Sequence, residues 1–186
     1  MTAPSPHYDA LSRVLHWLTA IAVLTAFVLG PEHFGREMRQ GLDPATRWDI
    51  VLHESLGLLV AALTLLRLLW LAVRPTPPRF ELPRWMQITA KATQGVLWLL
   101  LLAVPATALL ALSSEGHPLT LLGGIRVNDM PFIAQSPIAD MADWGEVHEL
   151  LGNAIMWLSG LHAVAAIYHH GALKDGVLRS MLPPRG

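Results

Sequence analysis

The residues of this sequence with the clearest chemical potential are histidines in hydrophobic segments. Four of them lie within apolar stretches: His16 in "RVLHWLTA", His53 in "VLHESLG", and His148 and His162 in "VHELLGNAIMWLSGLHAVAAIYHH". Ionisable side chains are expensive inside a membrane, and they mark functional sites when they occur there. Because neutral imidazole is the commonest metal ligand in proteins, these four residues indicate a metal or a metal-containing cofactor.

The spacing of His148 and His162 predicts two sites at two depths. They are fourteen residues apart, which on a helix brings the side chains back to within about 40° of one direction and separates them by roughly 21 Å. Depth within the apolar segments pairs His148 with His53 at an outer level, and His162 with His16 at an inner level. Each level offers two imidazoles from different helices, which is the ligand set of a b-type heme.

Other interpretations of these histidines remain open. A single intramembrane histidine can instead hydrogen-bond a neighbouring helix, although two depth-matched pairs favour a cofactor. Zinc usually takes three or four protein ligands, and the sequence contains no H-E-x-x-H motif, but "HESLG" and "HELLG" keep a metal site near the outer level as an alternative. The chain has no cysteine, which excludes iron–sulfur clusters, disulfides and covalently attached c-type heme.

Four apolar segments must position the histidines, at about residues 14–30, 51–73, 92–112 and 147–170. Each has about the length of 20 residues that a helix needs to cross a bilayer. Hydrophobic residues make up 53% of the chain and charged residues 15%, with a mean hydropathy of +0.42. We therefore predict an all-α protein with one domain over residues 1–186, an integral membrane four-helix bundle that encloses two b-type hemes. The first segment is followed by "GPEHFG", so we expect a membrane helix there and not a cleaved signal peptide.

The distribution of charge predicts the orientation. By the positive-inside rule, the side with more lysine and arginine is cytoplasmic, which places both termini inside and predicts a multi-pass protein of the bacterial inner membrane. A formal net charge of −1 and the lack of a basic run predict no nucleic-acid partner. One side carries Arg13, Arg74, Arg79, Arg84, Lys91, Lys174, Arg179 and Arg185, and the other carries Arg36, Arg39, Arg47 and Arg126.

Two further residues are candidates for the inner site. Arg67 lies fourteen residues after His53 and could pair with a heme propionate, or extend to the lipid headgroups. His169 lies seven residues after His162 and could supply a hydrogen bond or a proton near the inner site, or form a polar cap at the interface. Small residues on the helices fit either a flat cofactor or plain helix packing: Gly57, Gly95, Gly152, Gly160, Ala163 and Ala165.

The chain resembles the bacterial cytochrome b561 family, and within it the superoxide-oxidising diheme members. The resemblance covers nearly the whole chain and is carried by "RVLHWLTA", "HESLGLLVAALTLLRLLWLAVRPTPP" and "HELLGNAIMWLSGLHAVAAIYHHGALKD". It implies that His16, His53, His148 and His162 are the axial ligands of two hemes b. The family often has a histidine in the third helix where this chain has Gln94, which argues that no ligand is needed there.

The resemblance also implies a function. Superoxide would give its electron to heme and leave as dioxygen, and the electron would reduce ubiquinone. Arg36, Arg39, Arg47 and Arg126 are candidates for steering the anion, and His169 or Lys91 for a proton donor near the quinone. Two alternatives stay open: an electron-transfer subunit that relays electrons between a hydrogenase or dehydrogenase partner and the quinone pool, and a heme-free channel or metal carrier.

Overall fold

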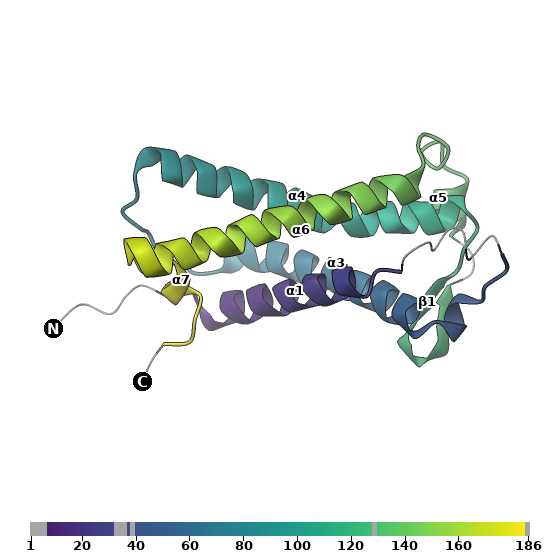
Figure 1. The fold of residues 1–186 in the computed structure, drawn as a ribbon, viewed down its shortest axis with the longest axis horizontal. Helices are drawn as coiled ribbons and strands as arrows, with labels where there is room; N and C mark the ends of the chain where they lie inside the picture. The colour runs from purple at the N-terminus through teal and green to yellow at the C-terminus, as the bar shows by residue number, and fades with distance from the viewer. Residues whose placement is uncertain (1–6, 32–36, 38–39, 128–129, 185–186) are drawn as a thin grey trace.

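The computed structural model describes residues 7–31, 37, 40–127 and 130–184. Within this part of the chain, four long helices run side by side (Figure 1). They are α1 (Ala10–Val28), α3 (Trp48–Val73), α4 (Arg84–Ser114) and α6 (Trp144–Tyr168). All four are long and apolar enough to cross a membrane. The predicted all-α membrane four-helix bundle is confirmed.

The helices begin earlier than their apolar cores predict. α1 begins at Ala10 because Asp9 caps it, its carboxylate accepting a hydrogen bond from the Ser12 amide at 2.8 Å. Asp143 caps α6 in the same way through the Glu146 amide, at 3.0 Å. α4 begins directly after Pro83, so its first two turns are more polar than the rest of the helix. Hydropathy detects the part of a helix that lies in hydrocarbon, whereas caps and polar turns extend it beyond that layer.

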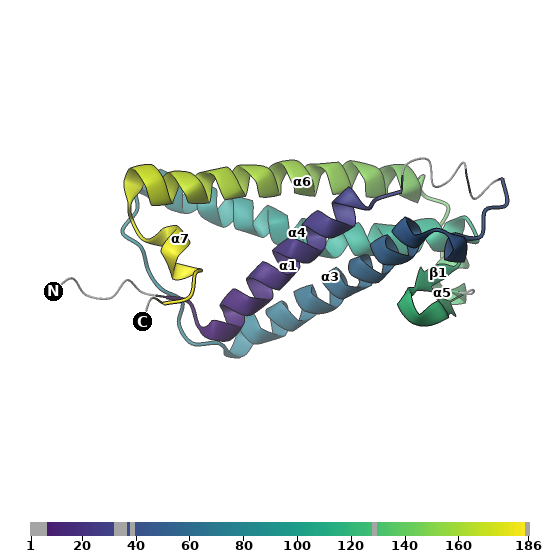
Figure 2. The ribbon, with the colours of Figure 1, turned by 60° about the horizontal axis from the view of Figure 1, so that its bottom comes forward.

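The helices associate as two pairs whose ends differ. α1 packs along α3 and α4 along α6, and the pairs diverge towards the end that holds both termini (Figure 2). We call this the terminal end; there the Tyr8 amide donates a hydrogen bond to the Ser180 carbonyl at 3.0 Å. Beyond Tyr168 the α6 helix continues as a π-helical turn, η3 (His169–Leu173), which leads to the short α7 (Val177–Ser180).

A small β-hairpin covers the opposite end, which we call the hairpin end. Strands β1 (Leu119–Leu121) and β2 (Ile125–Val127) pair antiparallel around the η2 turn (Leu122–Gly124). Gly123 and Gly124 both have positive φ, +81° and +77°, which glycine adopts without steric cost. The same long connection contains a short helix, α5 (Pro131–Ala134), and neither it nor the hairpin was predicted above. A short helix, η1 (Pro44–Thr46), precedes α3.

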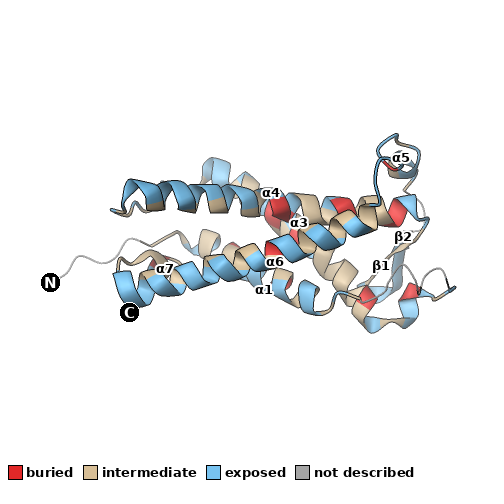
Figure 3. Ribbon diagram, turned by 45° about the horizontal axis from the view of Figure 1, so that its top comes forward, coloured by how far each residue is buried: buried red, intermediate tan, exposed pale blue. Residues whose placement is uncertain are grey.

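A layer of buried apolar side chains lies at mid-depth in the bundle (Figure 3). Ile155 lies midway between His148 and His162 along α6, and Val60 lies seven residues beyond His53 along α3. This layer therefore separates the two histidine levels with hydrocarbon. It draws on all four long helices: Ala22, Val60, Leu100, Leu101 and Ile155.

Candidate functional site

The structure brings His53 and His148 together at the hairpin end. His53 comes from α3 and His148 from α6, and their ring centres are 6.1 Å apart with the ring planes at 89°. Both side chains are partly buried. The two histidines that the sequence places at the same depth are therefore also neighbours in space. We call them the hairpin-end pair.

His16 and His162 form a second pair at the terminal end. His16 comes from α1 and His162 from α6, with ring centres 6.4 Å apart and planes at 71°. Trp17 lies edge-on to His16, its ring centre 5.4 Å away. We call His16 and His162 the terminal-end pair. A single helix, α6, thus contributes one imidazole to each pair.

Hydrogen bonds orient the rings of the hairpin-end pair. The Nδ1 atom of His53 lies 2.7 Å from the Ala26 carbonyl oxygen on α1, and Nδ1 of His148 lies 3.0 Å from the Val104 carbonyl oxygen on α4. A carbonyl only accepts, so each neutral imidazole must donate its proton from Nδ1. This leaves the Nε2 lone pairs free, which is the tautomer that a metal ligand needs.

The separation of the rings in each pair fits one metal ion between two imidazoles. Metal–imidazole bonds are about 2.0–2.1 Å long, and a ring centre lies about 1.1 Å behind its nitrogen, so one metal between two opposed rings separates their centres by about 6.2–6.4 Å. The observed separations are 6.1 Å and 6.4 Å. Two axial imidazoles suffice for a heme because the porphyrin supplies the remaining ligands.

The protein ligands that zinc would need are not gathered at either pair. Within the described ranges, no group of three or more His, Asp or Glu side chains is close enough to hold a metal ion. Glu54, next to His53, turns towards the hairpin and accepts a hydrogen bond from the Thr120 amide. Glu149, next to His148, is exposed. The carboxylates of "HESLG" and "HELLG" therefore do not complete a zinc site with the histidines.

Glycines leave room beside the hairpin-end pair. Gly57 and Gly152 each follow a hairpin-end histidine by four residues, about one helical turn, whereas Gly160 precedes His162 by two residues, so it lies on nearly the opposite side of α6 and is exposed. A Cβ atom added at any of these three, or at Gly95 on α4, would meet nothing within 4 Å. At Gly145, by contrast, it would come within 3.3 Å of two carboxylate oxygens. At Gly57 and Gly152 this room lies where a flat macrocycle would need thin helix walls, whereas Gly95 and Gly160 are exposed.

Arg67 stays inside the bundle near the terminal-end pair. Its guanidinium lies over the Trp98 ring of α4, 4.6 Å from the ring centre, and it is close enough to His16 for a direct electrostatic interaction. The sequence did not reveal this contact with Trp98, which joins α3 to α4. A stacked guanidinium of this kind keeps its edge available for anions.

His169 has a partner that the sequence did not reveal. Its Nδ1 atom is hydrogen-bonded to the Asp175 carboxylate, which also accepts a hydrogen bond from the Val177 amide at 3.1 Å. The two residues bracket the π-helical turn, a geometry that ordinary helical periodicity cannot predict. Lys91 and Gln94 are exposed on α4.

The described arginines at the hairpin end are paired with acids. Arg47 donates to Glu37 and Asp49, each at 2.6 Å, and these hydrogen bonds raise the pKa of Arg47. Arg126 lies 3.1 Å from Asp43. Arg36 and Arg39 lie outside the described residues. The positive charge that we expected to steer an anion is therefore locally compensated at Arg47 and Arg126.

Comparisons with known proteins agree with this arrangement. The family model of the prokaryotic cytochrome b561 proteins matches residues 7–184. The chain is 32% identical over 182 residues to the "Probable superoxide oxidase CybB" of Yersinia pestis, covering 96% of this chain and 97% of that one. It is 34% identical over 182 residues to "Cytochrome b562" of Cereibacter sphaeroides, covering 97% and 98%. It is 30% identical over 178 residues to "Cytochrome b561 homolog 2" of Escherichia coli K12, covering 94% and 90%.

Membrane-spanning helices, paired intramembrane histidines and a family match over nearly the full length lead to one conclusion: this chain is a membrane electron-transfer protein of the prokaryotic cytochrome b561 family, whose members bind b-type heme.

Proposed function

We propose that the chain binds two hemes b, one between His53 and His148 and the other between His16 and His162. The observation that carries the proposal is the pair of ring separations, 6.1 Å and 6.4 Å, at opposite ends of one bundle. Heme, when bound, supplies one-electron redox chemistry. The residues of the chain hold it and exclude water.

Each surrounding residue has a part in this proposal. The Ala26 and Val104 carbonyls fix the hairpin-end imidazoles in the ligating tautomer. Arg67, which already stacks on Trp98, pairs with a heme propionate at the terminal-end site. The apolar layer around Ile155 keeps water from the space between the two sites.

The net reaction that we propose is the oxidation of superoxide by ubiquinone. Two superoxide anions each lose one electron and leave as dioxygen, and one quinone gains two electrons and two protons. The name of the Yersinia pestis relative supports superoxide as the substrate. His169, oriented by Asp175, is our candidate for the group that delivers protons near the quinone.

We further propose an orientation in the bacterial inner membrane with both termini in the cytoplasm. The basic residues of the described chain concentrate at the terminal end, which the positive-inside rule assigns to the cytoplasm. Superoxide would then be oxidised near the hairpin end. The residues at the terminal end are Arg13, Arg74, Arg79, Arg84, Lys91, Lys174 and Arg179.

One observation favours a second function, an electron relay between a protein partner and the quinone pool. Arg47 and Arg126 are engaged by carboxylates, which weakens the attraction that a small anion would feel at the hairpin end. A relay does not need to attract superoxide, because its electrons come from a docked dehydrogenase or hydrogenase.

The two functions are separated by kinetics on the purified holoprotein. Superoxide is generated in the presence of a soluble ubiquinone, and quinol formation is followed with and without the protein. Superoxide oxidase activity predicts quinol formation well above the uncatalysed rate, and its loss when superoxide dismutase is added. A protein that binds heme but does not exceed the uncatalysed rate would instead be the relay.

A further inference from the structure

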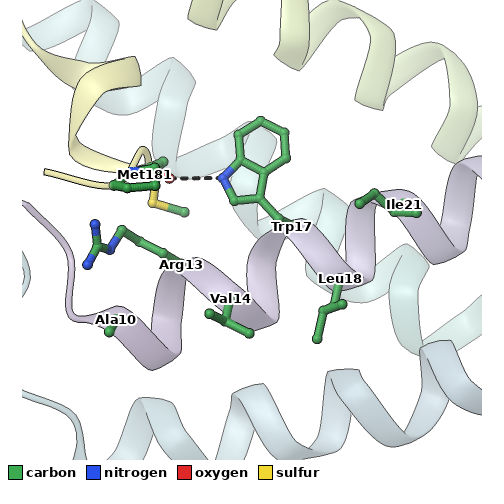
Figure 4. Close-up of a pocket in the computed structure, with 8 residues that line it drawn as sticks. Ala10, Arg13, Val14, Trp17, Leu18, Ile21 and Met181 are labelled. Carbon is green, nitrogen blue, oxygen red and sulfur yellow. Dashed lines mark hydrogen bonds between the residues drawn. The ribbon is translucent and has the colours of Figure 1, made fainter. Parts of the chain in front are cut away.

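A groove lies on the outside of α1 at the terminal end, between this helix and the C-terminal tail (Figure 4). Its volume is about 330 Å³ and its surface is almost entirely apolar. One wall is formed by Val14, Leu18 and Ile21 of α1, and the other by Met181 and Pro183 of the tail.

The groove faces away from the terminal-end histidines. The groove residues of α1 are offset from His16 by −2 (Val14), +2 (Leu18) and +5 (Ile21) positions. At about 100° per residue, each of these side chains points about 140–160° away from the direction of His16. Val14 is 53% exposed and Ile21 is 60% exposed in the absence of lipid. The groove therefore opens onto the bilayer and not onto the space between the helices.

Two hydrogen bonds hold the tail in place as the second wall. The Trp17 indole donates from Nε1 to the Met181 carbonyl at 2.9 Å, as Figure 4 shows. The Arg13 guanidinium donates from Nη1 to the Leu182 carbonyl at 2.8 Å. Because α1 contributes both donors, the groove is a built feature of the fold and does not depend on an unattached tail.

Arg13 has donors that the chain does not use. Among the described residues the only hydrogen-bond partner of its side chain is the Leu182 carbonyl, and its Nε atom is buried without a partner. Nε is enclosed by the chain, so an external acceptor would meet the half-exposed end of the guanidinium, where Nη1 donates to Leu182 and Nη2 has no hydrogen bond to the described residues. Guanidinium matches phosphate in charge and in the geometry of its donors.

We propose that this groove binds a phospholipid with an anionic headgroup, of which phosphatidylglycerol is the test case. The phosphate is held by Arg13, and one acyl chain lies along Val14, Leu18 and Ile21 towards the bilayer centre. A volume of about 330 Å³ is at the lower end of the ligand-pocket range of about 300–1,000 Å³, which suits part of one chain. The groove itself is apolar, so the preference for an anionic headgroup rests on the charge of Arg13 at its edge, because a basic residue at this kind of membrane boundary attracts anionic lipid.

The test measures lipid retention by the purified holoprotein in detergent micelles. Wild type is mixed with dioleoyl phosphatidylglycerol or dioleoyl phosphatidylcholine at equal concentrations, and bound lipid is counted by native mass spectrometry. We expect one retained phosphatidylglycerol and little phosphatidylcholine. We expect Arg13→Gln to bind phosphatidylglycerol roughly tenfold more weakly.

Matched variants separate charge, groove and tail. Leu18→Trp fills the groove without touching Arg13 and should also lose the lipid, whereas Arg179→Gln, which removes an exposed arginine of α7, should retain it. Trp17→Phe removes one of the two hydrogen bonds to the tail and keeps Arg13, so lipid loss in Arg13→Gln but not in Trp17→Phe assigns the effect to the charge, and equal loss in both variants would overturn that assignment. Equal retention of both lipids by wild type, unchanged retention in Arg13→Gln, or displacement by inorganic phosphate or decylubiquinone would each overturn the proposal.

Discussion

His53 and His148 face each other across the hairpin end of the bundle with ring planes nearly perpendicular, at 89°. Each ring is fixed by a hydrogen bond from its Nδ1 atom to a backbone carbonyl of another helix. The carbonyl belongs to α1 for His53 and to α4 for His148. The backbone of α1 and α4 therefore sets the orientation of side chains that α3 and α6 carry. In the proposed diheme arrangement, this ring geometry is one of the means by which the protein would tune the heme.

Perpendicular rings have a spectroscopic consequence. Two imidazole planes at right angles overlap almost equally with the two π-type iron d orbitals, dxz and dyz, which leaves these orbitals nearly degenerate. We expect the oxidised holoprotein to give highly anisotropic low-spin ferric signals in electron paramagnetic resonance. The ordinary rhombic spectrum of parallel rings, at both sites, would contradict the geometry of 89° and 71°.

Arg67 should raise the reduction potential of one heme. A buried cation beside the terminal-end pair favours the reduced state, which carries one electron more. We expect Arg67→Gln to lower the potential of the terminal-end heme by tens of millivolts, where about 59 mV corresponds to a tenfold change in equilibrium constant. A redox titration followed by visible absorbance measures both hemes. Arg74→Gln is the control, because Arg74 lies at the end of α3, over the Tyr8 ring. If Arg67→Gln changed only the potential of the hairpin-end heme, the placement of Arg67 beside the terminal-end heme would be contradicted.

Glu54 should anchor the β-hairpin to α3. Its carboxylate accepts the Thr120 amide, and the Ser55 hydroxyl accepts the Leu122 amide at 2.9 Å. We expect Glu54→Ala to speed amide hydrogen exchange in residues 119–127, because an interaction of about 1–3 kcal/mol is lost. Glu149→Ala, at the exposed glutamate of the matching "HELLG", should leave exchange there unchanged. Equal amide exchange rates in residues 119–127 of the two variants would contradict the anchoring role of Glu54.

Asp9 links stability to pH at the terminal end. Partial burial raises the pKa of Asp9, but hydrogen bonds from Ser12 and Trp70 outweigh this effect and hold the pKa below its ordinary value of 3.8. A lowered folded-state pKa stabilises the fold above the unfolded pKa, and this contribution is lost as the pH falls through the folded value. We expect Asp9→Ala to reduce the free energy of unfolding by about 1 kcal/mol at pH 7.

The measurement is thermal unfolding in detergent at pH 7 and near pH 3. The difference between wild type and Asp9→Ala should shrink at the acid pH, and Asp140→Ala, at an exposed loop position, should show little effect at either. A difference that grows as the pH falls would reverse the sign of the expected linkage.

Some features of the fold and site follow from the sequence because they repeat along a helix. Hydropathy located the four helices, and the interval from His148 to His162 placed two imidazoles on one helix at two depths. Both features depend only on regular helical geometry. The pairing of each with His53 or His16 then followed from the depth within each segment.

Other features depend on contacts that no local pattern specifies. The stacking of Arg67 on Trp98 joins two helices, and the bond from His169 to Asp175 crosses a π-helical turn whose spacing differs from 3.6 residues. The hairpin strands have only three residues each, too few for an alternating pattern to be recognised. Among the outer arginines, the carboxylates that neutralise Arg47 and Arg126 became apparent only in three dimensions.

Heme content per chain tests the central claim most directly. We expect wild type to contain two hemes b, and His148→Ala and His162→Ala to lose one each, with different remaining spectra and potentials. His170→Ala, which removes an exposed histidine of the same helical segment, should keep both. A wild type with one heme, or histidine variants that both retain two, would contradict the two-site account.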